Sequence, residues 1–248
     1  MSEFKIFSDE FWSPLAKYGL TSKFWLLNSE TLINSWATLI VMLIVLIFAR
    51  MSLTKRNSIP CFLVLSIVRA LKDLVSQSLK RFNSGHFYFV SAVFIYILFN
   101  NIISIIPWFE EPTTDVNTTL AFGIISFGYV QAASIRANGL AGYFKEFFEP
   151  FFLMFPLNIV GELAKIISIS FRLFGNIFGG SVISKLFASA VQGSIAGESL
   201  AILSGVNFLI TGFFVLFEGT IQAFVFAMLT LTYIALATQG EIEEKAAA

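Results

Sequence analysis

The residue in this sequence that most needs a chemical explanation is Arg172. It stands in the otherwise apolar stretch Ser168-Ile-Ser-Phe-Arg172-Leu-Phe-Gly-Asn176-Ile-Phe-Gly-Gly180. A guanidinium is always charged in proteins, and placing one at bilayer depth costs at least ~2.5 kcal/mol on insertion scales. The side chain is therefore either a functional charge or one that snorkels to a nearby interface. The long apolar flanks on both sides favour the functional charge.

A helix through this stretch would have one small and polar face. At helical spacing Arg172 shares that face with Lys165, Ser168, Gly175, Asn176 and Gly179. Gly175 and Gly179 are four residues apart, a spacing that lets a second membrane helix approach closely. The sequence therefore predicts a partner helix next to the arginine.

The last apolar stretch carries a second polar stripe. On a helical wheel five of its side chains point in a similar direction: Asn207, Thr211, Glu218, Gln222 and Tyr233. Antiparallel packing of the two stretches brings Gln222 near Arg172, where its amide oxygen can accept a guanidinium hydrogen bond. Glu218 is either a proton-relay carboxylate or the structural partner of a basic residue such as Lys185 or Lys165.

Other charged groups allow two interpretations each. Glu162 and Lys165, three residues apart, either line an ion path or simply pair with each other. Asp115 and the two glutamates before it form either the mouth of an aqueous pathway or an ordinary solvated loop. Asn117 follows them and can cap the next helix.

Composition indicates a multi-pass membrane protein. Of 248 residues 56% are hydrophobic, 13% are charged and 30 are phenylalanine, which is too apolar for an ordinary soluble domain. The formal net charge is zero, so nothing indicates nucleic-acid binding. With a single cysteine, Cys61, and a single histidine, His86, we expect no metal site and no cofactor. No nucleophile with an adjacent base and no phosphate-binding loop is present, so we expect a protein that is not itself catalytic.

The apolar pattern predicts an all-α fold with about five membrane-embedded helices, near residues 32–48, 87–106, 118–135, 156–190 and 200–237. The last two are each ~50 Å or longer if continuous, against a hydrocarbon core of ~30 Å, so we expect a strongly tilted hairpin or broken helices. Amphipathic stripes at 64–81 and 144–151 predict helices at the membrane surface. The chain would be one membrane domain, divided into an outer segment 1–30, three spans within 31–155, the hairpin 156–238 and a polar tail 239–248.

Charge predicts the orientation in the membrane. The loop between the first two spans is strongly basic, with Arg50, Lys55, Arg56, Arg69, Lys72, Lys80 and Arg81 against Asp73 alone. The positive-inside rule places this loop in the cytoplasm, or in the matrix of an organelle. Five spans then put the N-terminus and the acidic loop 108–117 outside and the C-terminus inside. A bacterial inner membrane fits best, with a mitochondrial inner membrane as the alternative.

Several motifs together resemble the a subunit of F-type ATP synthases. They are Ser-Phe-Arg172-Leu-Phe-Gly-Asn176, Ile221-Gln222-Ala-Phe-Val-Phe-Ala-Met-Leu-Thr230, Asn100-Asn101-Ile-Ile-Ser-Ile-Ile-Pro107, Thr114-Asp115-Val-Asn117-Thr-Thr119, and Pro156-Leu-Asn158 through Glu162 and Lys165. The resemblance covers most of the chain after about residue 60.

This resemblance implies a stator that lies against a rotating ring of c subunits, with a b-type peripheral stalk and the lipid bilayer as further partners. Two offset aqueous half-channels would carry protons, although sodium is not excluded. Arg172 would match the family's essential arginine, and Asn176 and Gln222 its polar neighbours. The half-channel lining would include Asp115, Asn117, Glu162, Lys165, Ser168, Ser181, Asn207 and Tyr233.

The chain departs from the family pattern at two positions. The residue nine after the arginine, often acidic or histidine in the family, is Ser181, and the residue seven before the glutamine, often glutamate or histidine, is Val215. We expect Glu218 to replace the missing proton acceptor. The alternative function is a secondary transporter or ion channel whose arginine binds an anionic substrate. That function predicts paired inverted halves with broken helices, which the sequence does not contain. A structural scaffold would have no reason to bury Arg172, Glu218 and Gln222 together.

Overall fold

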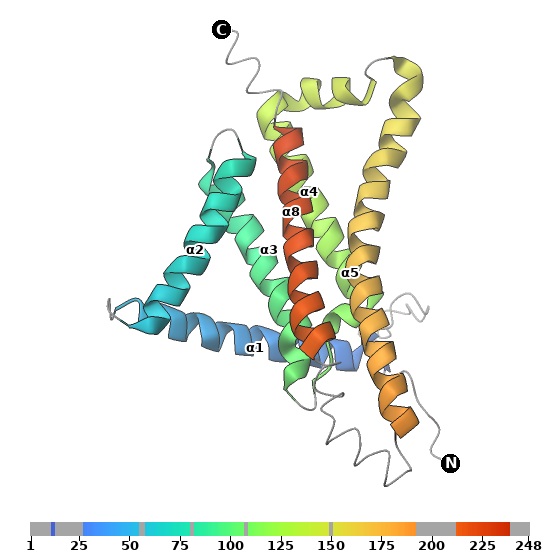
Figure 1. Cartoon of the computed structure of the whole chain (residues 1–248). Coiled ribbons are helices and arrows are strands. Elements are labelled where there is room, and N and C mark those ends of the chain that lie inside the picture. Colours follow the sequence, from blue (N-terminus) through green and yellow to red (C-terminus); the bar gives the residue numbers. More distant parts are fainter. Residues whose placement is uncertain are drawn as a thin grey trace.

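The structure is a computed structural model that describes residues 11–12, 27–54, 58–79, 82–106, 109–148, 151–191 and 212–238. Within these ranges nearly all of the chain is helical, as Figure 1 shows. The only strands in the described ranges are two short antiparallel ones, β1 (Phe11–Trp12) and β2 (Leu27–Asn28). The predicted all-α class is confirmed.

The described chain contains six α-helices, one π-helix and three short 3-10 helices. The α-helices are α1 (Ser29–Ser52), α2 (Ile59–Ser78), α3 (Ser84–Ile102), α4 (Val116–Phe148), α5 (Phe155–Val191) and α8 (Gly219–Ala237). The others are η3 (Ile103–Ile105), η4 (Pro112–Thr114), η5 (Phe152–Met154) and the π-helix η6 (Gly212–Glu218).

Five helical stretches in the described ranges are long and apolar enough to cross a membrane: Ser29–Ser52, Ser84–Ile105, Val116–Lys145, Phe152–Phe187 and Gly212–Ala237. They correspond to the five predicted elements, so the multi-pass membrane class is confirmed. The predicted start of the last element near residue 200 lies outside the described residues, as does the tail 239–248.

Local sequence explains where several helices begin and bend. The side chains of Asn28 and Asn83 accept backbone N–H bonds from Glu30 at 3.0 Å and Gly85 at 2.8 Å, which caps α1 and α3. The third span was expected to end near residue 135, but α4 continues to Phe148 across a kink at Gly139. Gly139 has φ 72°, a conformation that glycine adopts without steric cost.

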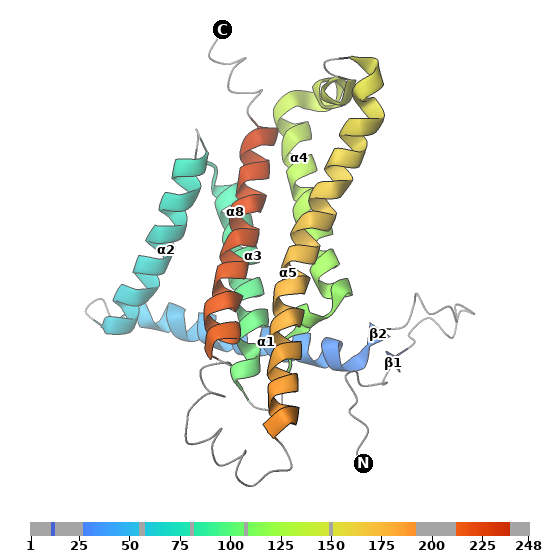
Figure 2. The same cartoon turned by 45° about the vertical axis from the view of Figure 1, so that its right-hand side comes forward.

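Helices α3, α4, α5 and α8 pack together and enclose two apolar clusters. In Figure 2, α8 lies in front of α3, while α5 runs beside α4 and α8. One cluster joins α2, α3, α4 and α8 around Val90, Val130 and Leu231. The other joins α3, α5 and α8 around Ile97, Leu173 and Phe226. This second cluster fixes how α5 and α8 face each other near Arg172.

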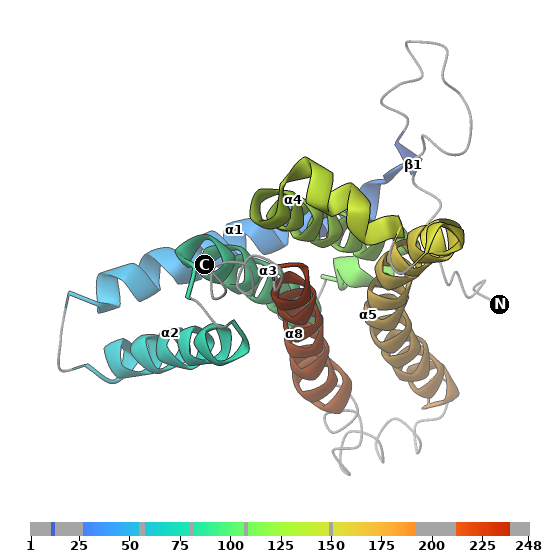
Figure 3. The same cartoon turned by 90° about the horizontal axis from the view of Figure 1, so that it is seen from above.

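Helix α1 lies across the other helices instead of alongside them. All three views show this arrangement (Figure 1, Figure 2 and Figure 3), and the first two show α2 rising from the far end of α1. Many of the apolar side chains of α1 are exposed, among them Ile40, Ile44 and Ile47. Exposed aliphatic groups of this kind suit contact with lipid.

Candidate functional site

A hydrogen bond joins α5 and α8 at the centre of the site. The Nδ2 amide of Asn176 donates to Oε1 of Gln222 at 2.6 Å. Gln222 is only 3% exposed, whereas Asn176 lies on the exposed side of α5. The sequence analysis expected the guanidinium of Arg172 to be the donor. That expectation was wrong, because Asn176, one turn further along α5, takes the place of the arginine.

Arg172 itself is exposed on the surface of α5. Among the described residues it makes no hydrogen bond or ion pair. Its orientation follows from its neighbour Leu173, which is fully buried together with Ile169 and Ile177. Successive helical residues point about 100° apart, so burial of Leu173 turns Arg172 outward.

The face around Arg172 has room for another helix. An added Cβ at Gly175 or at Gly179 would meet no atom within 4 Å. Ser168, one turn before the arginine, is also exposed. The predicted small and polar face is therefore present, and no described helix of this chain covers it at the two glycines.

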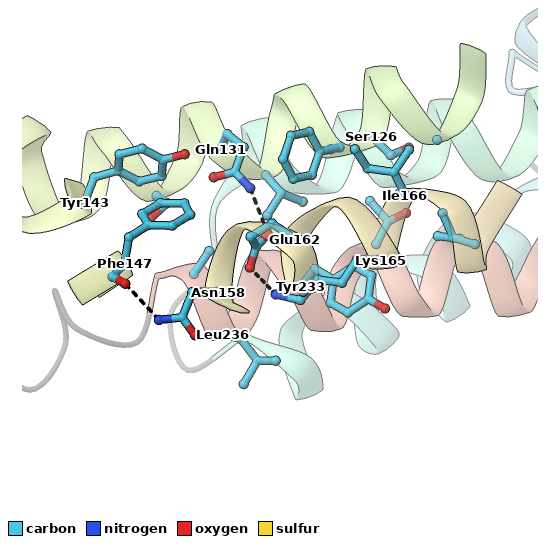
Figure 4. A pocket seen from close by; sticks show the side chains of 18 of the residues that line it. Ser126, Gln131, Tyr143, Phe147, Asn158, Glu162, Lys165, Ile166, Tyr233 and Leu236 are labelled. Carbon is cyan, nitrogen blue, oxygen red and sulfur yellow. Dashed lines mark hydrogen bonds and ion pairs between the residues drawn. The ribbon is translucent and has the colours of Figure 1, made fainter. Parts of the chain in front are cut away.

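A cavity of about 390 Å³ lies among α4, α5 and α8, and we call it the Gln131 cavity. Gln131 Nε2 donates to Glu162 Oε2 at 3.0 Å, and Lys165 donates to the other oxygen of Glu162. The Nζ of Lys165 also lies 5.5 Å from the centre of the Tyr233 ring. Figure 4 shows these four side chains together on the cavity wall. The predicted Glu162–Lys165 pair therefore exists and also lines a polar cavity.

A second cavity, of about 200 Å³, lies at the other end of α5, and we call it the Ser181 cavity. Its polar and charged lining consists of Asn101, Ser104, Glu110, Glu111, Thr114, Asn176, Ser181, Ser184 and Lys185. Lys185 pairs with Glu110 at 3.0 Å, and both side chains are about half exposed. Lys165 and Lys185 thus have carboxylate partners other than Glu218.

Glu111 lies inside the Ser181 cavity and is only partly exposed. The hydroxyl of Ser104 donates a hydrogen bond to its Oε1. Burial raises the pKa of the Glu111 carboxyl above its ordinary value of 4.5, and the nearby Glu110 charge adds to this. The Ser104 hydrogen bond, a backbone hydrogen bond and the Lys185 charge lower the pKa, but burial is the largest effect.

Buried hydrogen bonds fix the start of α8 against α3. Asn101 Nδ2 donates to the carbonyl oxygen of Gly219 at 2.8 Å, and Thr113 Oγ1 donates to Asn101 Oδ1 at 2.8 Å. Asn101 and Thr113 are at most 1% exposed, so breaking either bond would leave a buried polar group unpaired. These two hydrogen bonds fix the position of Gly219, and they therefore also fix Gln222, which follows less than one turn later in α8.

Comparison with known proteins decides the family. The sequence profile described as "ATP synthase A chain" matches residues 32–235. The chain belongs to the ATP synthase A chain family. It is 35% identical over 216 residues to the ATP synthase subunit a of Moorella thermoacetica, covering 85% of this chain and 91% of that protein.

Two further relatives support the same assignment. The "ATP synthase subunit a, sodium ion specific" of Propionigenium modestum is 33% identical over 227 residues, which is 86% of this chain and 73% of that protein. The ATP synthase subunit a of Helicobacter hepaticus is 34% identical over 208 residues, which is 79% of this chain and 85% of that protein. The family resemblance drawn from the motifs is confirmed. As an ATP synthase A chain, the protein is a membrane-sector subunit for ion transport.

The remaining site residues predicted for this ATP synthase A chain lie in different parts of the chain. Ser181 and Val215 both line the Ser181 cavity. Asp115 Oδ1 accepts the N–H of Asn117 at 2.9 Å at the start of α4, and neither residue lines a cavity described here. Asn207 lies outside the described residues.

Glu218 is the last residue of the π-helix η6 and is partly exposed. The prediction that Val215, Glu218 and Gln222 share one face assumed a continuous α-helix. That prediction was wrong, because a π-helix has more residues per turn than an α-helix. Val215 faces the Ser181 cavity, whereas Glu218 lines neither cavity. Within the described residues Glu218 has no hydrogen bond or ion pair.

Sequence reasoning missed Gln131, Ser104 and the burial of Glu111. Gln131 lies in a weakly patterned stretch of α4, and nothing in its own neighbourhood points to Glu162, 31 residues later. Glu111 is seven residues after Ser104 and meets it only because the chain turns between η3 and η4.

Proposed function

We propose that this ATP synthase A chain is the ion-translocating stator subunit and that its two cavities are the half-channels. The observation that carries the proposal is their position along α5. The Gln131 cavity ends at Ile169, three residues before Arg172, and the Ser181 cavity begins at Asn176, four residues after it. Arg172 lines neither cavity and stands between them.

The exposed face around Arg172 is the proposed contact for the ring of c subunits. Gly175 and Gly179 leave space there for a helix of the ring to come close. Two offset ion paths require one polar cavity on each side of the charged arginine that contacts the ring. The Gln131 cavity and the Ser181 cavity meet this requirement. The other proposed partners are a b-type peripheral stalk and the lipid around α1.

The chemistry of the fixed cation then follows. A guanidinium beside a ring carboxylate favours the ionised form and lowers the pKa of that carboxylate. The carboxylate must release its proton into one half-channel before it passes Arg172, and it can regain a proton only from the other. The positive charge also repels cations that would otherwise leak between the half-channels. The subunit thus couples ion flow to rotation without a catalytic group of its own.

The charge pattern supports placing the two cavities on opposite sides of the membrane. The Ser181 cavity lies next to the acidic loop after α3, which the positive-inside rule puts outside. The Gln131 cavity lies next to the ends of α4 and α8, on the cytoplasmic side by the same rule. We propose a bacterial plasma membrane, with the N-terminus outside and the C-terminus inside. Helix α1 runs crosswise to the direction of α5 and α8 in Figure 1, so those two helices are inclined if α1 is upright, which supports the proposed tilt.

The proposed ion is the proton. The sodium specificity printed for the Propionigenium modestum relative makes sodium the alternative. Glu218 is proposed to pass protons between the Ser181 cavity and the ring, together with Asn176 and Gln222 near the arginine.

The experiment is ATP-driven acidification of inverted vesicles that carry the assembled complex, with native chain or Arg172→Ala, in buffers with and without sodium. The proposal predicts sodium-independent pumping by the native complex. The variant should lose pumping but keep the ATPase activity of the catalytic sector. Undiminished pumping by Arg172→Ala would contradict the proposal.

A further inference from the structure

The Ser181 cavity lacks the titratable groups that its family places there. Ser181 and Val215 stand at the two usual positions, both line this cavity, and neither can exchange a proton near neutral pH. A proton that crosses the cavity therefore needs another group. The ionisable groups among its described lining residues are Glu110, Glu111 and Lys185.

Two of these three neutralise each other at the open end. Glu110 and Lys185 form an ion pair at 3.0 Å, with side chains 57% and 44% exposed. Each of these two charges already has its partner, so Glu111 is the carboxylate of the lining without an ion pair among the described residues. Glu111, in contrast, lies deeper and has one oxygen bonded to the Ser104 hydroxyl.

We propose that Glu111 is the proton-exchanging residue in the lining of the Ser181 cavity, and that it takes up the proton that Glu218 then passes to the ring. This inference rests on the proposed function and names a further residue of the same half-channel. A proton from the outer water forms an O–H bond to a carboxylate oxygen of Glu111. The same proton then leaves Glu111 along the cavity toward its arginine end at Asn176. Glu218 passes it on to an ionised carboxylate of the ring, which gains the O–H bond, and Glu111 is ionised again.

Three features of the site suit this role. The Ser104 hydroxyl orients the carboxylate and can turn to accept a hydrogen bond once the carboxyl is protonated. The pKa of Glu111 is raised by burial, which brings proton uptake closer to the pH of the surrounding water. The Glu110 charge strengthens proton binding and the Lys185 charge weakens it, and these two face Glu111 from the loop and from α5.

The test is passive proton conduction through vesicles stripped of the catalytic sector, driven by a potassium diffusion potential at several outer pH values. Glu111→Gln should lower conduction by about 100-fold, the low end of what a positioned proton-transfer group contributes. Glu111→Asp should keep part of the conduction with a shifted pH profile. The matched control is Glu30→Gln, which removes an exposed carboxylate at the start of α1, away from both cavities, and should conduct like the native chain.

A second variant separates proton exchange from a structural role. Glu111→Gln combined with Ser181→Glu returns a carboxyl to the same cavity from α5 and should restore conduction. Native conduction by Glu111→Gln, or a loss that neither Glu111→Asp nor the added Ser181→Glu restores, would overturn the inference. If Arg172→Ala still abolishes coupled pumping in that case, only the inference fails. If Arg172→Ala pumps normally, the proposed function fails as well.

Discussion

Asn176 and Gln222 join α5 to α8 through a single hydrogen bond of 2.6 Å between their side-chain amides. Asn176 also lines the Ser181 cavity, whereas Gln222 is buried between the helices and lines neither cavity. The bond therefore lies at the arginine end of the Ser181 cavity, about one turn of α5 from Arg172. It ties the helix that carries the arginine to the helix whose start is fixed by Asn101.

Replacing Asn176 with leucine should destabilise the subunit. The variant leaves the Oε1 atom of the buried Gln222 without its donor, and an unpaired buried polar group costs about 1–3 kcal/mol. Thermal unfolding of the purified complex in detergent measures the effect. The reciprocal exchange Asn176→Gln with Gln222→Asn keeps one donor and one acceptor and should recover part of the loss. Equal melting temperatures for native chain and Asn176→Leu would speak against an energetic role for the bond.

Replacing Glu218 with glutamine should abolish proton translocation. The carboxyl lies at the junction of η6 and α8 inside an apolar stretch and has no ion-pair partner among the described residues, and an ionisable group in such a stretch is by default a functional one. ATP-driven acidification of inverted vesicles measures the loss. Unimpaired pumping would show that Glu218 is not on the proton path. Glu111 would then be the proposed proton-exchanging residue of the outer half-channel.

Gly180 and Gly179 are adjacent but should respond differently to substitution. A Cβ at Gly180 would lie 2.7 Å from the ring and 3.2 Å from the Cβ of Phe214, so Gly180→Ala must displace the Phe214 side chain or push α5 away from η6. Gly179→Ala meets nothing within 4 Å and should leave subunit stability unchanged. Gly179→Trp should insert normally but weaken coupling, because its ring would occupy the face proposed for the c subunits. Thermal unfolding and vesicle acidification separate the two effects, and equal stability of the two alanine variants would count against the packing.

The stability of the chain should depend on pH through Glu111. Burial raises the pKa of this carboxyl, so the folded chain holds more protons than the unfolded chain between pH 4.5 and the raised pKa. The free energy of unfolding should therefore fall as the pH rises through that interval. Glu111→Gln removes the titration and should flatten this part of the curve. If the free energy of unfolding depends on pH in the same way for the native chain and the variant, the Glu111 carboxyl is not buried in the folded chain.

Much of the fold could be predicted from the sequence because apolar length and helical period are local properties. Runs of apolar residues indicated the five elements. The predicted cap at Asn117 was wrong, because α4 begins at Val116 and the Asp115 carboxylate accepts the N–H of Asn117. The Glu162–Lys165 pair was also predictable, since three residues separate two neighbours on one helix face. Arg172 stood out because a charge in an apolar stretch is costly.

The contacts between helices could not be predicted in the same way. Whether Gln222 bonds to Arg172 or to Asn176 depends on how α5 is rotated, and that rotation is set by burial of Leu173 in the core. The π-helix before Gly219 changes which side chains share a face, and a wheel drawn for an α-helix cannot include it. Ser104 meets Glu111 through a turn of the chain, which no periodicity in the sequence announces.

The most direct measurement is the side from which each cavity can be reached by water. In a background with the single cysteine replaced by Cys61→Ser, one cysteine is introduced by Gln131→Cys and another by Ser181→Cys, in separate chains. A charged, membrane-impermeant thiol reagent is then added to right-side-out or inverted vesicles. The account predicts labelling of Ser181→Cys only from the outside and of Gln131→Cys only from the cytoplasmic side. Labelling of both variants from the same side would contradict two half-channels separated by Arg172.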